Sequence, residues 1–257
     1  MSWDRNIVIK TTADIEQMRI AGRINAEALQ TVKSLIRPGI TTAALDAAAE
    51  EFIRSHGAVP AFKGYPGPYP YPATLTISIN DELVHGIPGK RVIRPGDVVS
   101  VDCGTIYGGF VGDSAFSMVV EPASEEALRL LDITEKSLYA GIAKMRSGNR
   151  VGDVSAAVQQ YVESHGYYVT REYTGHGVGR DMHEGPMVPN YGHPGRGLRL
   201  RAGMTIALEP MVLVGTARTR VLPDQWTVVS ADGSLTAHFE HSVLVTDGEP
   251  EILTAWR

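Results

Sequence analysis

The chain has 257 residues, of which 43% are hydrophobic and 21% charged, proportions that are ordinary for a globular protein with a substantial core. The formal net charge of −5 argues against specific nucleic-acid binding, because phosphate recognition needs a clustered basic surface. Cys103 is the one cysteine and can form neither an internal disulfide nor a CxxC zinc motif, which favours a reducing, cytoplasmic setting. No apolar run approaches the ~18 residues of a membrane span, and the run from Ile7 to Ile9 is too short for a signal peptide.

Four segments have the apolar periodicity of helices. Thr11 is a candidate N-cap of the first segment, with Asp14 as its capping-box partner. Gly57 and Gly166 follow the second and fourth segments at the position where helices commonly end. The predicted helices cover residues 11–36, 42–56, 124–146 and 153–165.

Residues 58–74 contain five prolines interleaved with three tyrosines and are predicted to form a loop. A polyproline ligand for an adaptor domain is an alternative, but a structural loop near a binding pocket is favoured. Because the helices fall in pairs that are each followed by strands, the pattern indicates an α+β fold rather than an alternating parallel one. The predicted strands cover residues 74–79, 97–103, 110–120, 204–214, 226–230 and 236–246.

The two halves of the chain resemble each other. An Arg-Pro-Gly motif at Arg37 precedes a helix that ends in Ser-His-Gly57, and an Arg-Ser-Gly motif at Arg146 precedes one that ends in Ser-His-Gly166 at the same spacing. Further along, the segment 94–102 resembles 201–209. His-Gly-Ile-Pro at 85–88 also resembles His-Glu-Gly-Pro at 183–186.

This repeat predicts one domain over residues 1–257, built from two similar halves at about 11–120 and 121–250. A site formed between such halves would draw its side chains from both of them.

Acidic residues occupy equivalent places in the repeat. Asp102 aligns with Glu209, and each follows an apolar, strand-like run, where a carboxylate is costly to bury unless it is paired or binds a metal. Asp113 follows Asp102 across a Gly-Gly turn, so that the two carboxylates could face each other on adjacent strands. Glu240 lies in the corresponding later strand of the second half.

His176 lies between glycines, which let the backbone approach closely and leave the imidazole accessible. Four carboxylates and one neutral imidazole suit two divalent ions about 3.5–4 Å apart, and they permit Mn, Co, Fe or Zn. Singly, Asp113 or Glu240 is more often a solvated or salt-bridged strand residue, but their joint occurrence in a repeated frame favours the metal site. The stretch 175–179 lacks GxGxxG spacing and a following helix, which disfavours a phosphate loop.

The motifs around these residues resemble those of the methionine aminopeptidases, from about Ile9 to Val245. Only thirty-two residues separate His176 from Glu209, which leaves no room for the helical insertion of the type II form, so the chain resembles the short bacterial type I form. The resemblance implies the pita-bread fold, in which two pseudo-symmetric halves, each with a helix pair and antiparallel strands, share a curved sheet. The motifs are Val101-Asp-Cys-Gly, Gly112-Asp-Ser-Ala, Gly175-His-Gly-Val-Gly, Leu208-Glu-Pro, Phe239-Glu-His-Ser and Ser78-Ile-Asn-Asp-Glu-Leu-Val-His-Gly.

The resemblance also implies roles for individual residues. Asp113 and Glu240 would bridge two divalent ions, and Glu209 would also accept a proton from a metal-activated water. His85 and His183 correspond to residues that hydrogen-bond the substrate and the developing oxyanion. The five implied metal ligands are Asp102, Asp113, His176, Glu209 and Glu240.

A pocket for the methionine side chain is implied as well. Tyr65, Met182 and Trp226 match family positions that line it, and an apolar, sulfur-tolerant lining suits that side chain. Phe62 and Thr76 stand where the family often has cysteine. The loop leaves open whether Tyr69 or Tyr71 is the second pocket tyrosine.

The implied activity is removal of the initiator methionine from nascent polypeptides with a small second residue, by a cytoplasmic monomer that could dock on the ribosome. A proline-specific aminopeptidase or dipeptidase on the same scaffold is an alternative, which the chain length and Trp226 disfavour. A non-catalytic, peptide-binding relative is disfavoured because all five ligand positions are filled. Since Ser2 is small, the enzyme could process its own N-terminus, Met1-Ser2.

Overall fold

The computed structural model describes residues 7–255, so the Met1-Ser2 pair lies outside the described residues. Within them, four helices confirm the four predicted segments. The predicted capping box is present, since the Thr11 hydroxyl accepts from the Asp14 backbone N–H and the Asp14 carboxylate accepts from the Thr11 N–H. Gly57 and Gly166 have the positive φ angles, 70° and 84°, expected after a helix end. The helices are α1 (Thr12–Leu35), α2 (Thr42–Ser55), α3 (Glu125–Ile142) and α4 (Val151–Ser164).

Two helix boundaries differ from the prediction. The third helix ends at Ile142 rather than near residue 146, because the chain turns there and Arg146 forms a β-bridge with Thr246. The fourth helix begins earlier, at Val151, because the Asp153 carboxylate accepts a 2.7 Å hydrogen bond from the Arg150 backbone N–H.

Nine strands form one antiparallel sheet in the order β1-β4-β5-β14-β9-β7-β8, with β2 also paired to β4 and β15 to β14. Two three-stranded sheets, β13-β10-β6 and β11-β12-β3, flank it. The strands are β1 (Val59–Pro60), β2 (Leu75–Ile79), β3 (Glu82–Val84), β4 (Val98–Tyr107), β5 (Phe110–Val119), β6 (Tyr168–Val169), β7 (Thr174–Gly177), β8 (Glu184–Pro189), β9 (Thr205–Leu208), β10 (Met211–Leu213), β11 (Thr219–Val221), β12 (Val228–Ser230), β13 (Thr236–His238), β14 (Glu240–Leu244) and β15 (Glu251–Ile252).

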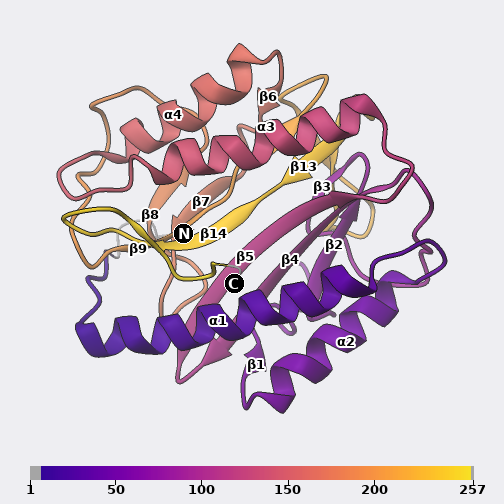
Figure 1. The fold of residues 1–257 in the computed structure, drawn as a ribbon, viewed down its shortest axis with the longest axis horizontal. Coiled ribbons are helices and arrows are strands. Elements are labelled where there is room, and N and C mark those ends of the chain that lie inside the picture. Colours follow the sequence, from indigo (N-terminus) through magenta and orange to yellow (C-terminus); the bar gives the residue numbers. More distant parts are fainter. Residues whose placement is uncertain (1–6, 256–257) are drawn as a thin grey trace.

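The large sheet has the two-half arrangement that the repeat predicts. Strands β2, β4 and β5 come from the first half of the chain, and β14, β9 and β7 come from the second. The two groups are joined by the pairing of β5 with β14. The helices α1 and α2 lie along the first half, and α3 and α4 along the second (Figure 1). The fold class is therefore α+β, as predicted.

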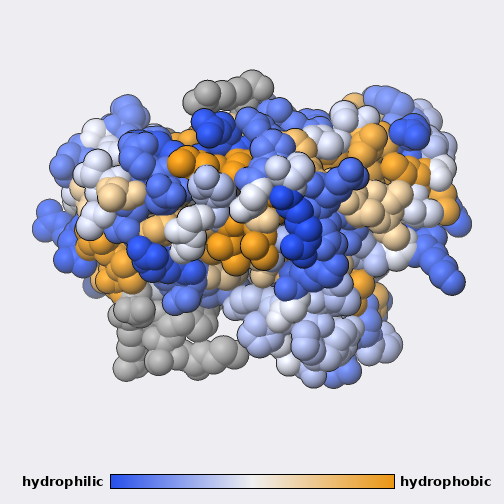
Figure 2. All heavy atoms as spheres, turned by 90° about the horizontal axis from the view of Figure 1, so that it is seen from below, coloured by the Kyte–Doolittle hydropathy of each residue, from blue (hydrophilic) through white to orange (hydrophobic). Residues whose placement is uncertain are grey.

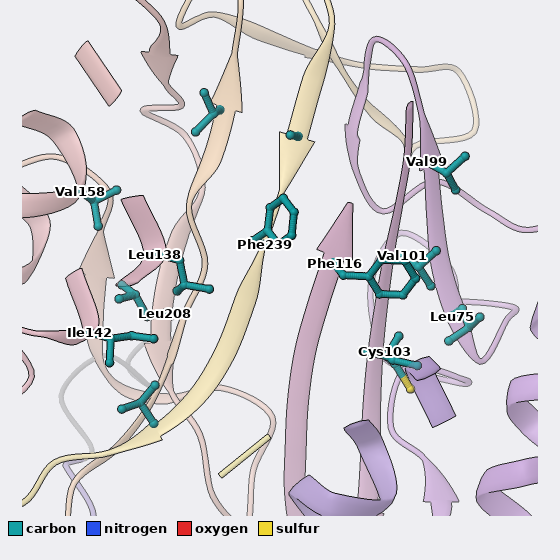
Figure 3. Packing of buried hydrophobic residues seen from close by; sticks show 14 of the residues in the cluster. Leu75, Val99, Val101, Cys103, Phe116, Leu138, Ile142, Val158, Leu208 and Phe239 are labelled. Carbon is teal, nitrogen blue, oxygen red and sulfur yellow. The ribbon is translucent and has the colours of Figure 1, made fainter. Parts of the chain in front are cut away.

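The core lies between these helices and one face of the sheet. Val101 and Cys103 of β4 and Ile206 and Leu208 of β9 point into it, and all four are fully buried. Figure 3 shows this apolar cluster extending under both halves, with Phe116 and Phe239 between the two sides. Because successive strand residues point to opposite faces, the residues that alternate with these point away from the helices.

On the face seen in Figure 2, polar residues cover most of the surface and the apolar residues form separate patches, which is usual for a surface in contact with water. Among residues 7–255, no helix is both long and apolar enough to cross a membrane.

Candidate metal centre and substrate pocket

Three carboxylates converge through the register of β4, β5 and β14. Asp102 pairs with Ala115, and Glu240 pairs with the same Ala115 from the other side. Asp113 lies two residues before Ala115 on β5, so its side chain projects from the same face. Residues directly or diagonally opposite on one face are within reach of each other. The helix side of the sheet is filled by the core, so these carboxylates lie on the other side.

Glu209 and His176 reach the same face from the second half. Leu208 pairs with His241, and continuing this register by one residue places Glu209 opposite Glu240. His176 of β7 pairs with Ala207, two residues before Glu209. The four carboxylates and the imidazole are therefore brought together by the antiparallel register of five adjacent strands.

The distances agree with this convergence. His176 Nε2 lies 3.8 Å from Asp113 Oδ2 and 3.5 Å from Glu209 Oε1. Ligand atoms of Asp113, His176 and Glu240 all lie within 4.8 Å of one another, a separation that one cation could span. Asp102 and Glu209 border the same cavity.

This cavity has a volume of about 160 Å³. Every side chain that the sequence proposes for metal, substrate or pocket contacts borders it. Phe62, a pocket position in the family, and Tyr71, one of the two candidate tyrosines, complete the lining. The proposed residues at the cavity are Asp102, Asp113, His176, Glu209, Glu240, His85, His183, Tyr65, Thr76, Met182 and Trp226.

Burial changes the protonation of the carboxylates. Desolvation raises the pKa of Asp113 to about 7, although a hydrogen bond with Glu240 opposes the shift. Desolvation, followed by repulsion from neighbouring carboxylates, raises the pKa values of Asp102, Glu209 and Glu240 well above their usual range. Without a positive charge, this cluster is costly to bury.

The unpaired atoms of the cluster fit a divalent cation. Asp102 Oδ1, Asp113 Oδ1 and Glu240 Oε1 are buried and have no hydrogen-bond partner. His176 has a pKa lowered to about 3, first by burial and then by His183, so its imidazole is neutral, which is the state that binds metals. Carboxylate oxygens with one imidazole suit first-row divalent ions.

The glycines beside His176 permit close packing, as expected. A Cβ on Gly175 would lie 2.6 Å from the carbonyl oxygen of Ala207, and one on Gly177 would collide with the carbonyl of Gly185. The His176 imidazole is less accessible than the sequence predicted. His176 is 4% exposed, because the strands on both sides enclose it and leave it open only to the cavity.

The two remaining histidines border the cavity beside the carboxylates. Burial, followed by the effect of His183, lowers the pKa of His85 to about 4, and its backbone has a positive φ of 61°. Burial also lowers the pKa of His183, whose Nδ1 lies 2.6 Å from the Tyr65 hydroxyl. Neutral imidazoles in these places can donate or accept hydrogen bonds toward a bound substrate.

The tyrosine loop resolves the question of the second tyrosine. Tyr71 is 3% exposed, its hydroxyl donates to the carbonyls of Leu75 and Gly86, and its ring packs edge-on against Trp226 at 5.1 Å. Tyr69 is 37% exposed, and its hydroxyl donates to the Asp224 carbonyl outside the cavity lining. Tyr71 is therefore the residue beside the pocket.

The sequence analysis missed one polar residue, His238, beside the carboxylate cluster. His238 is 2% exposed, and its Nε2 lies 3.6 Å from Glu209 Oε2 and 3.9 Å from Glu240 Oε2. The signal was available, because His238 precedes Glu240 by two residues and shares its face where a strand continues.

Comparison with known proteins identifies the family of this chain. Residues 16–247 match metallopeptidase family M24. A methionine aminopeptidase from Clostridium acetobutylicum is 50% identical over 249 residues, which cover 96% of this chain and 98% of that protein. Methionine aminopeptidase 1 from Bacillus subtilis is 46% identical over 96% of this chain and 99% of its own length.

Solved structures of methionine aminopeptidases and a prolidase have a similar fold. The crystal structure of methionine aminopeptidase from Thermotoga maritima superposes with a TM-score of 0.94 at 46% identity, covering 96% of this chain and 99% of that one. A prolidase from Pyrococcus furiosus, at 23% identity and a TM-score of 0.78, shares the fold.

The fold and the carboxylate–imidazole cluster are thus those of a metallopeptidase with the pita-bread fold. The chain belongs to metallopeptidase family M24, and within it to the type I methionine aminopeptidases.

Proposed function

We propose that this protein hydrolyses the peptide bond after an N-terminal methionine, with a preference for a small second residue. The observation that carries the proposal is the cavity itself, in which a buried carboxylate cluster lies beside a pocket walled by Tyr65, Tyr71, Met182 and Trp226. An unbranched thioether side chain suits such an aromatic and sulfur-containing wall. The relatives named above carry the same activity in their names.

Asp102, Asp113, His176, Glu209 and Glu240 would hold two divalent ions, of Co, Mn, Fe or Zn. When bound, such ions polarise a carbonyl oxygen and lower the pKa of a water molecule. Membership of a metallopeptidase family and the unpaired carboxylate oxygens support a metal site here.

The remaining polar residues have proposed roles that follow from their places. The Glu209 carboxylate, whose pKa is raised, can accept a proton and pass it to the leaving amine. His85 and His183 are half-buried and have lowered pKa values, so each is neutral and can donate a hydrogen bond to the carbonyl oxygen as negative charge develops on it. The Tyr65 hydroxyl orients the His183 ring through Nδ1.

We also infer the biological setting. Residues 1–257 are proposed to form a single domain that acts as a cytoplasmic monomer on the N-termini of nascent polypeptides, and docking on the ribosome would be consistent with that substrate. The mild net negative charge of −5 argues against nucleic acid as the main partner.

The test compares two peptides on the metal-reconstituted protein. Met-Ala-Ser should be cleaved with release of methionine, and Ala-Pro-Ala should be cleaved at least ~100-fold more slowly, because a pocket built for one side chain discriminates strongly against another. Faster turnover of Ala-Pro-Ala would favour a proline-specific peptidase, and no turnover of either peptide would favour a non-catalytic relative.

A further inference from the structure

His238 lies at the metal cluster although nothing in the proposed chemistry uses it. Its backbone is held firmly, since its N–H donates to Ser117 Oγ at 2.9 Å and its carbonyl accepts from the same hydroxyl at 2.8 Å. The position of the imidazole is therefore set by β5 as well as by β13.

The imidazole of His238 is buried and its Nε2 has no hydrogen-bond partner. A buried ring nitrogen without a hydrogen-bond partner is unfavourable, so native proteins normally supply one. The carboxylates of Glu209 and Glu240 lie just beyond hydrogen-bond distance, with Glu209 the nearer of the two.

The Glu209 carboxylate lies between two histidines. Its Oε1 faces His176 Nε2 at 3.5 Å, and its Oε2 faces His238 Nε2 at 3.6 Å. If His176 and Glu209 bind the same ion, one oxygen of Glu209 is directed to the metal and the other remains toward His238. A shift of about half an ångström would then complete a normal hydrogen bond from Nε2–H to Oε2.

We propose that His238 is a positioning residue of the metal centre, which donates a hydrogen bond from Nε2 to Glu209 Oε2 and fixes the carboxylate in its metal-binding orientation. The proposal rests on the metal site in the proposed function. Residues that orient a ligand in this way raise metal affinity without contacting the metal. His238 would act only through Glu209, so it need not touch the substrate.

The alternative is a buried histidine that only fills space, and metal titration separates the two. Isothermal titration of Mn²⁺ into metal-depleted protein measures affinity independently of activity. His238→Phe keeps the ring but removes the donor, and should weaken binding roughly 10- to 100-fold. His238→Gln restores a donor and should recover most of that loss.

A matched control is available three residues along the chain. His241 is also buried, at 8% exposure, but its side chain lies on the opposite face of β14 and its Nδ1 is 2.9 Å from Thr254 Oγ1. His241→Gln should leave Mn²⁺ affinity within about twofold of the unsubstituted protein.

Thermal unfolding in EDTA accompanies each titration, and His238→Ala replaces the phenylalanine variant if that variant does not fold. Activity on Met-Ala-Ser at saturating Mn²⁺ gives a second readout, in which kcat should fall while KM changes little.

Equal Mn²⁺ affinity in His238→Phe and the unsubstituted protein would overturn the role of His238 alone. An equal loss in His238→Gln and His238→Phe would contradict the hydrogen bond. Failure of the unsubstituted protein to bind Mn²⁺ would instead overturn the proposed metal site, and the His238 inference with it.

Discussion

Asp113 and Glu240 lie diagonally opposite each other across the β5–β14 pairing, where the two halves of the chain meet. Each is followed by a residue that points into the opposite side of the sheet, Ser114 and His241, and these two are directly paired. The meeting of the halves therefore brings one carboxylate from each half to a common point. The three residues whose ligand atoms lie within 4.8 Å of one another, Asp113, His176 and Glu240, likewise come from both halves.

The loop that carries His183 is anchored by a buried ion pair between Lys10 and Glu184, whose side chains are 2% and 3% exposed. The Glu184 carboxylate also accepts a 2.8 Å hydrogen bond from the Arg180 backbone N–H. Lys10→Met would leave this carboxylate buried without its cation, so the free energy of unfolding should fall by about 3–5 kcal/mol. Urea denaturation measures this loss.

The control is an ion pair of the same residue types on the surface. Lys63 and Glu50 lie 2.7 Å apart with side chains 43% and 23% exposed, and solvent screening makes such pairs weak. Lys63→Met should therefore cost less than about 1 kcal/mol. Similar losses in the two variants would show that burial of the Lys10 pair has no special effect.

Stability should depend on pH through His85. Its folded pKa of about 4 lies below the unfolded value of 6.5, so the unfolded state binds more protons between these values. The stabilisation is complete above pH 6.5 and is lost as pH falls toward 4. Between pH 8 and pH 5 it amounts to about 2 kcal/mol.

Urea denaturation of metal-depleted protein at the two pH values tests this dependence. His85→Gln removes the titrating group, so its free energy of unfolding should fall about 2 kcal/mol less than that of the unsubstituted protein. His56→Gln, a substitution of an exposed histidine, is the control and should leave the fall unchanged. An equal fall in all three proteins would mean that His85 is not kept neutral by burial.

The side-chain pocket should depend on Trp226. Its ring packs edge-on against Tyr71 and covers Gly67, where a Cβ would collide with it. Trp226→Ala removes apolar contact surface that the ground state and the transition state share, so KM for Met-Ala-Ser should rise about 10-fold with a smaller change in kcat. Tyr139→Ala, at an exposed aromatic residue on α3, should change neither value. An unchanged KM in Trp226→Ala would remove this residue from the pocket.

The sequence predicted the four helices because helical periodicity is a local signal. It predicted that the carboxylates lie together because the internal repeat aligns Asp102 with Glu209. It missed β7 and β8, since glycine and proline dilute the strand pattern there, and backbone contact with β9 holds β7 in place instead. The choice of Tyr71 over Tyr69 depends on how the loop folds against Trp226, which residue spacing cannot determine. The two-residue spacing between His238 and Glu240 could have indicated His238, but its approach to Glu209 depends on the pairing of β9 with β14, which are distant in the sequence.

The metal centre is tested most directly by measuring methionine release from Met-Ala-Ser. The metal-depleted protein is assayed before and after addition of Mn²⁺, Co²⁺, Fe²⁺ or Zn²⁺, and the Asp113→Ala and His176→Ala variants are assayed in the same way. Activity should be absent without metal and return with at least one ion, and both variants should lose at least ~100-fold even with metal added. Full activity in the metal-depleted protein, or in either variant, would contradict a metal centre at the meeting of the two halves.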